Sequence, residues 1–141
     1  MHFQWNLECS VGLGGQNHLN CDVSYIQWYY KLAAINPKTP SDLRAICSKV
    51  AITGQCSGRA DDPLVQAITA HQKALSHPNI DGKISVAKGD GKVGGKAYFI
   101  LRLGARLSDM FPKAWPRLDQ IPGCPLLVTQ AVAAAVPIIS V

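Results

Sequence analysis

Few side chains of this 141-residue chain are placed to do catalytic chemistry. Glu8 is its one glutamate, and the pair that the sequence offers for glycan hydrolysis is Glu8 with Asp22. Such a site needs two carboxyl groups held about 5 to 10 Å apart. Asp22 also stands at the start of an expected helix, where a carboxylate caps backbone N–H groups. Capping is the simpler role, so the sequence favours no hydrolytic centre.

Histidine spacing indicates no metal site. The four histidines are His2, His18, His71 and His77. They form neither HxH nor HExxH, so a metal would have to be bound by distant segments. His18 beside Cys21 has the residue types of a nucleophile and its base, but no third residue is placed to orient them. A buried cysteine that acts as a small apolar residue is the simpler alternative.

The cysteine pattern indicates neither a zinc site nor a complete disulfide framework. The five cysteines are Cys9, Cys21, Cys47, Cys56 and Cys124. Their number is odd and no two form CxxC, so at least one thiol should be free. The separation of Cys47 and Cys56 permits a disulfide in an oxidising compartment, although geometry decides whether it forms.

Glycine-rich and basic segments predict no nucleotide or nucleic-acid partner. The stretches VGLGG and GDGKVGG lack the GxxxxGK[ST] pattern, and neither is a GxGxxG between a strand and a helix, so we expect no cofactor. The formal charge of +5 favours an anionic partner. The positive charges are densest between Lys83 and Lys96, where the lysines alternate with glycines and Asp90. This pattern is typical of a solvated loop.

The elements that position these residues are mainly helices. Apolar periodicity predicts principal helices over about 22–34, 62–75 and 95–108, a minor helix from Ser41, and a C-terminal helix over 126–136. Either Asn20 or Asp22 is expected to cap the first, and Asp62 the second. Ile26, Ile68 and Leu101 lie centrally on the three apolar stripes, so we expect them in the core. No internal repeat is evident.

Length and composition favour one domain over residues 1–141, in which residues 108–141 form a proline-rich connection and a C-terminal helix. The apolar run 128–141 is shorter than the roughly 18 residues of a bilayer span. The N-terminus shows no basic segment followed by an apolar one. We therefore expect cytoplasmic synthesis, no membrane span and no export by the general secretory route.

Three segments carry recognisable motifs, and their order along the chain is informative. They are SVGLGGQNHLNCDVSYIQWYYKL, then DDPLVQAITAHQKAL, then DGKISVAKGDGKVGGKAYFIL. Over residues 10–107 this order resembles the peptidoglycan-binding-like three-helix family. The family's first helix carries Asp-Val and then a Gln, as do Asp22, Val23 and Gln27 here. By physics alone, Gln27 and Gln72 are expected to bond to backbone groups near loops.

Later parts of the family pattern also have counterparts. Its second helix is entered through an acidic residue and ends in aromatic-Gln, which corresponds to Asp62 and to His71-Gln72. Its closing DG turn corresponds to Asp81-Gly82. The chain differs in two respects, because about fifteen to twenty extra residues separate the first two helices and a histidine replaces the usual aromatic.

The resemblance implies a non-catalytic module that binds peptidoglycan or its fragments. Such a chain would reach the periplasm or cell wall of bacteria with a secretion-system or effector protein. Two alternatives stay open: a small wall-degrading or toxin enzyme that uses Glu8 and segment 36–60, and a structural or interaction protein on the same scaffold.

We expect the ligand site where the loop 14–18 and the loop 81–92 lie beside the helix ends. Glycine-rich backbone there offers N–H groups, lysines attract peptide carboxylates, and exposed aromatic rings would stack on a sugar. The alternatives are solvated loops and aromatic rings covered by the chain termini. The expected contact residues are Asn17, His18, Tyr25, Trp28, Asp81 and Lys83.

Overall fold

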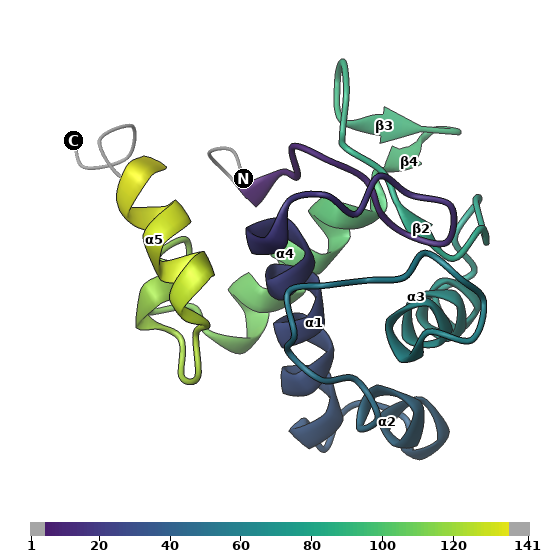
Figure 1. The fold of residues 1–141 in the computed structure, drawn as a ribbon, viewed down its shortest axis with the longest axis horizontal. Coiled ribbons are helices and arrows are strands. Elements are labelled where there is room, and N and C mark those ends of the chain that lie inside the picture. The colour runs from purple at the N-terminus through teal and green to yellow at the C-terminus, as the bar shows by residue number, and fades with distance from the viewer. Residues whose placement is uncertain (1–4, 136–141) are drawn as a thin grey trace.

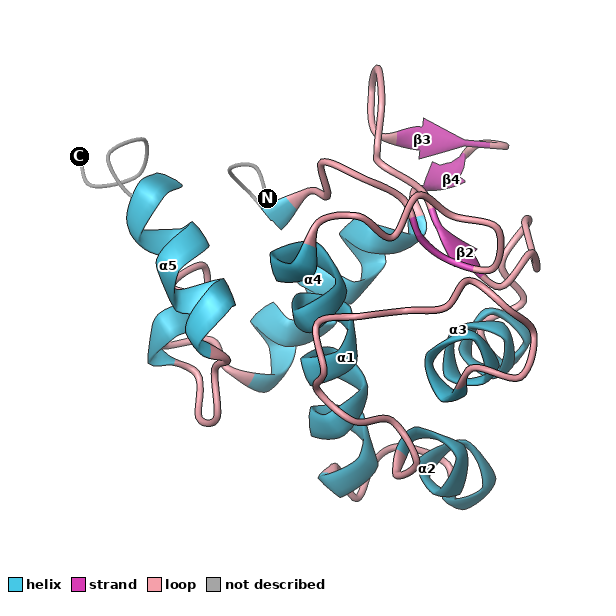
Figure 2. Cartoon of the chain, in the orientation of Figure 1, coloured by secondary structure: helices cyan, strands magenta, loops and turns pink. Residues whose placement is uncertain are grey.

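The computed structural model describes residues 5–135, and most of the ordered structure in this part of the chain is helical (Figures 1 and 2). The mainly α fold is thus confirmed, with three principal helices, a minor helix and a C-terminal one. The helices are α1 (Asn20–Ile35), α2 (Ser41–Cys47), α3 (Pro63–Ala74), α4 (Phe99–Met110), the short 3-10 helix η2 (Leu118–Gln120) and α5 (Leu126–Ala135).

Four short strands accompany the helices. They are β1 (Val11–Gly12), β2 (Lys83–Ile84), β3 (Lys92–Val93) and β4 (Lys96–Ala97). Strand β1 pairs antiparallel with β2, with Gly12 opposite Lys83, and β3 pairs antiparallel with β4. Gly12 has a φ of +122°, and a Cβ there would lie 2.3 Å from the Gly82 carbonyl oxygen, so only glycine fits this crossing.

The N-termini of α1 and α3 differ in how they are capped. Asp62 caps α3 as predicted, since its carboxylate accepts the Leu64 N–H at 2.9 Å. The expected cap on α1 is wrong, because Leu19 occupies the cap position and no side chain bonds there. Asp22 is instead buried and accepts the backbone N–H groups of Glu8 at 2.7 Å and Cys9 at 3.1 Å. Its carboxylate therefore fastens the N-terminal segment to α1.

The apolar face of α4 differs from the expected one. Ile26 and Ile68 are fully buried, as predicted, but Leu101 is only partly buried. Leu103 and Leu107 face the core instead. The helix also begins at Phe99 and not near residue 95, because the β3–β4 hairpin occupies 92–97.

One hydrophobic core extends from the N-terminal segment to α5. Trp5 and Leu7 are buried at its beginning, and Val128 and Val132 of α5 at its end. Helix α5 packs against α1. Every principal helix therefore contributes to the same core, which fixes the positions of the polar side chains described below.

Helices α1 and α3 each hold a glycine turn with the same pattern of hydrogen bonds from a glutamine. This structural repeat was not predicted from the sequence. Gln27 of α1 and Gln72 of α3 each accept a glycine N–H at 2.9 Å, from Gly54 and Gly82 respectively. Each also donates at 3.0 Å to the carbonyl of the following residue, Gln55 or Lys83. The expectation that both glutamines bond to backbone groups is confirmed.

The repeat extends to the residues around each turn. Ser24 and Thr69, each one turn before its glutamine, press on the two glycines: a Cβ at Gly54 would lie 3.2 Å from the Ser24 hydroxyl, and one at Gly82 would lie 2.8 Å from that of Thr69. Both glycines have positive φ. The sequence gives no sign of this repeat, because its two turns, Thr53-Gly54-Gln55 and Asp81-Gly82-Lys83, share only the glycine.

Candidate ligand-binding pocket

Two of the residues expected to contact a ligand are buried. Tyr25 is 0% exposed and Trp28 is 2% exposed, so neither ring can stack on a sugar. The indole nitrogen of Trp28 lies beside Gly123, 3.7 Å from where a Cβ would stand. The alternative interpretation is confirmed: both rings are covered by other parts of the chain, so they do not form the exposed stacking surface that the predicted site required.

The two loops lie beside each other, as predicted, but two of the four polar side chains expected at the ligand, those of Asn17 and Asp81, bond to the backbone. The Leu13 N–H donates to the Gly82 carbonyl at 2.9 Å. Asn17 accepts the Gly12 N–H at 2.8 Å and donates to its carbonyl at 3.0 Å. Asp81 accepts the Lys83 N–H at 3.1 Å. These two side chains therefore hold their own turns in shape.

The space beside these loops is small. The hollow that Asp81 and Lys83 help to line has a volume of about 20 Å³, which is room for about one water molecule. His18 is exposed on the neighbouring loop. This hollow is thus too small to hold a wall fragment.

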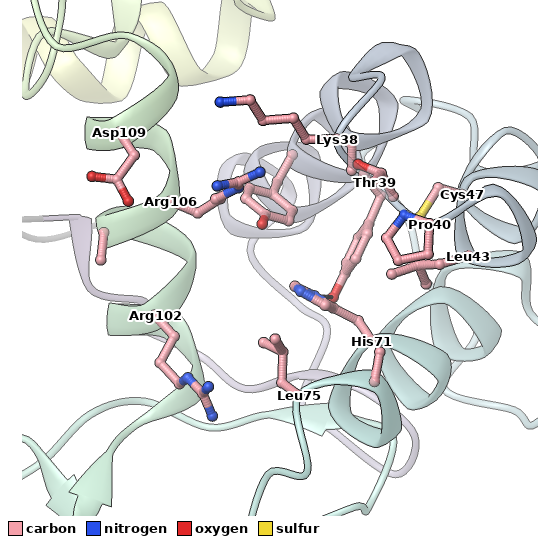
Figure 3. Close-up of a pocket in the computed structure, with 15 residues that line it drawn as sticks. Lys38, Thr39, Pro40, Leu43, Cys47, His71, Leu75, Arg102, Arg106 and Asp109 are labelled. Atoms are coloured by element: carbon pink, nitrogen blue, oxygen red, sulfur yellow. Dashed lines mark hydrogen bonds between the residues drawn. The ribbon is translucent and has the colours of Figure 1, made fainter.

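A larger cavity of about 450 Å³ lies between α4 on one side and α2 and α3 on the other (Figure 3). This volume is within the range of small-molecule and peptide pockets. We call it the central pocket. Its lining residues are Tyr29, Tyr30, Ala33, Lys38, Thr39, Pro40, Leu43, Cys47, His71, Ala74, Leu75, Arg102, Ala105, Arg106 and Asp109.

Aromatic groups hold His71 inside the central pocket. The Tyr30 hydroxyl and His71 Nδ1 are hydrogen-bonded at 3.0 Å, and the rings of Tyr29 and His71 stack with centroids 5.9 Å apart. Phe99 meets the imidazole edge-on at 5.0 Å. The His71 imidazole thus packs as an aromatic ring would.

The charge state of this cluster follows from its surroundings. Burial, together with the nearby cations of Arg102 and Arg106, lowers the pKa of His71 to about 4, so the imidazole is neutral at pH 7. Burial raises the pKa of the Tyr30 hydroxyl well above its usual value. Both groups are uncharged, and the pocket's charge comes from its rim.

That rim is cationic. Lys38, Arg102 and Arg106 line the central pocket together with a single acid, Asp109. The guanidinium groups of Arg102 and Arg106 make no hydrogen bond or ion pair with any residue in the described range 5–135. The Nη1 atom of Arg102 is moreover buried from water. Donors without partners in such a place favour an anionic ligand.

Catalytic groups are poorly developed in the same pocket. Burial raises the pKa of the Cys47 thiol to about 11, so little of the nucleophilic thiolate exists at pH 7. The lining includes one carboxylate, whereas glycan hydrolysis commonly uses two. The central pocket is therefore better suited to binding than to bond cleavage.

The structure also gives no support to the nucleophile, acid-pair, disulfide and metal-site hypotheses within the described residues. Burial raises the pKa of the Cys21 thiol, and Asp22 is fully buried, so neither fits a nucleophile or a hydrolytic acid pair. Cys47 and Cys56 are both free thiols, so the permitted disulfide is not formed. Among residues 5–135, no group of three or more His, Cys, Asp or Glu side chains is arranged to bind a metal ion.

The sequence contained one signal for the central pocket. Arg102 and Arg106 are four residues apart, so they share one face of α4. That face lies away from the apolar residues Leu103 and Leu107. A paired cationic stripe on an amphipathic helix marks a surface, but it does not indicate which other helices lie opposite.

Within the described residues, no helix has both the length and the apolar character to cross a bilayer.

Comparisons with known proteins identify no relative. Searches against protein-family models, curated proteins and solved structures each find no match to this chain. The likeness to peptidoglycan-binding-like domains therefore rests on the ordered motifs alone.

Proposed function

We propose that this chain is a non-catalytic binding module for bacterial peptidoglycan and that the ligand occupies the central pocket. One observation carries the proposal: a peptide-sized pocket has an apolar and aromatic lining and a rim of three cations against one acid. Peptidoglycan carries anionic peptide branches with small apolar side chains. Charge and polarity therefore match.

The motif order supports the wall as the source of the ligand. Asp22, Gln27, Asp62 and Gln72 correspond to the family pattern, and all four hold the scaffold by the bonds described above. Segment 36–60, which the family pattern lacks, supplies Lys38, Pro40 and Leu43 to the pocket. In this proposal the protein reaches the wall with a secretion-system effector.

A sedimentation assay with insoluble peptidoglycan tests the proposal. We expect the wild-type protein to sediment with the wall and to release no soluble fragments. Ala105→Trp should reduce the bound fraction, because Ala105 is exposed on α4 and an indole there would obstruct the pocket. Ala60→Trp, on an exposed loop outside the pocket, serves as the matched control.

The outcomes separate the classes of function. Release of soluble wall fragments would indicate a hydrolase and contradict a non-catalytic module. Failure of the wild-type protein to sediment would contradict wall binding altogether. Equal sedimentation of both tryptophan variants would place the ligand outside the central pocket.

A further inference from the structure

Arg102 and Arg106 lie one helical turn apart on α4, and both line the central pocket. In Figure 3 their side chains extend from α4 into the space that separates it from His71 and Leu75. Neither guanidinium is bonded to another residue of the described chain. Two adjacent cations that form no ion pair within the described residues can together receive an anion.

We infer that Arg102 and Arg106 bind a free carboxylate of the ligand, so the pocket recognises the peptide branches of the wall and not its glycan strands. This inference rests on the proposed function and adds the chemical class of the ligand to it. A carboxylate is planar and has two acceptor oxygens. Arginine binds such a group with two parallel hydrogen bonds.

The environment of the arginines strengthens this assignment. Their charges repel each other and also act on the half-buried His71 ring, which stays neutral beside them. An incoming carboxylate would relieve that repulsion. Because water is partly excluded from Arg102, a charged hydrogen bond there is stronger than at an open surface.

The opposite wall of the pocket suits the rest of a peptide. Leu43 of α2, Ala74 at the end of α3 and Leu75 just after it present apolar groups there. Small methyl side chains, such as those of alanyl residues, would pack on them once the carboxylate is held by α4. A disaccharide, with hydroxyl groups around its rings, would leave those hydroxyls against apolar carbon.

Titration calorimetry with defined soluble probes tests the inference. We expect an alanyl-alanine-terminated wall peptide with a free carboxylate to bind, and the same peptide with a C-terminal amide to bind at least about tenfold more weakly. A disaccharide of N-acetylglucosamine, which has no carboxylate, should not bind. Acetate should compete with the peptide at least as well as inorganic phosphate.

Charge-removing variants connect the probes to the two arginines. Arg102→Gln and Arg106→Gln should each weaken binding of the free-carboxylate peptide by about tenfold or more and leave the amide's weaker binding nearly unchanged. The control is Arg59→Gln, because Arg59 is 79% exposed on a loop outside the pocket. Thermal melts of all three variants establish that they are folded.

Several results would overturn the carboxylate assignment while wall binding survives. These are equal binding of peptide and amide, binding of the disaccharide alone, stronger competition by phosphate, and sedimentation with the wall in the absence of binding to any soluble probe. If the wild-type protein neither sediments with the wall nor binds a probe, the proposed function fails together with the inference.

Discussion

The buried side chain of Gln72 is hydrogen-bonded to backbone groups of the turn that contains Gly82 and Lys83. Its amide accepts the Gly82 N–H at 2.9 Å and donates to the Lys83 carbonyl at 3.0 Å. It also donates to the Asp81 carboxylate at 3.2 Å. A polar group this deep in the protein persists because hydrogen bonds to protein groups replace those it would make to water.

Replacement of this amide by an apolar group should be costly. Gln72→Leu leaves the Gly82 N–H and the Lys83 carbonyl without partners, so we expect a loss of about 2 to 5 kcal/mol in the free energy of unfolding. Urea denaturation measures it. Gln66→Leu, at an exposed position of the same helix, should change stability by less than about 0.5 kcal/mol. Similar losses in both variants would mean that the turn does not depend on Gln72.

His71 makes the stability of the folded protein depend on pH. Its pKa falls from 6.5 to about 4 on folding, so between these values the unfolded chain binds more protons than the folded one. Stability from this group is complete above about pH 6.5 and is lost as the pH falls. The loss reaches about 3 kcal/mol below pH 4.

The variant His71→Gln tests that dependence, because glutamine does not titrate and can still bond to the Tyr30 hydroxyl. Denaturation from pH 7 to pH 4 should show a smaller loss of stability in this variant than in the wild-type protein. His18→Gln, on an exposed loop, controls for removal of an imidazole. An unchanged pH profile in His71→Gln would show that other groups cause the loss.

Single residues were predictable where one local bond decides their role. Asp62 at a Pro-entered helix start has one obvious function, and it caps α3 as expected. Tyr25 and Trp28 were not predictable in this way. Whether they are covered depends on a distant part of the chain, and Gly123 beside Trp28 is far away in sequence.

At the scale of elements, α4 separates two roles on two faces. Leu103 and Leu107 face the core, and Arg102 and Arg106 line the central pocket. The sequence indicated the helix but misplaced its start and its apolar stripe, because Tyr98 and Leu101 continue a plausible period through the turn after β4. A two-residue hairpin strand gives no periodic signal of its own.

A pair of truncations tests the assigned faces of α4. Leu103→Ala should destabilise the fold by about 2 to 5 kcal/mol, because Leu103 is 1% exposed and its removal leaves a cavity. Leu101→Ala should cost clearly less, since Leu101 is only partly buried and neighbouring atoms or water can fill the space. Thermal or urea unfolding distinguishes the two. A larger loss for Leu101→Ala would reverse the assignment of the core face.

At the scale of the molecule, the central pocket is a product of topology. Its walls come from α1, the segment around α2, the end of α3 and the middle of α4. No local pattern brings Lys38, His71 and Arg106 together. The sequence therefore predicted the helices and the glutamine bonds but placed the site at loops near the helix ends, where the hollow lined by Asp81 and Lys83 is small.

Segment 36–60 forms part of the pocket wall, a role that its sequence alone does not indicate. In the sequence it is a stretch between two predicted principal helices with only a minor helix expected in it. In the structure α2 packs against both α1 and α3, and Pro40 and Leu43 form part of the pocket wall. The added segment therefore completes the cavity on which the proposed function depends.

Chemical-shift mapping of the 15N-labelled protein with a soluble wall peptide tests the central claim most directly. We predict that the shifted amides gather around the central pocket, at Thr39, Leu75, Arg102 and Arg106. The loops at 14–18 and 81–92 should stay unchanged. Shifts confined to those loops, or no shifts at a saturating concentration of peptide, would contradict a wall-peptide site in the central pocket.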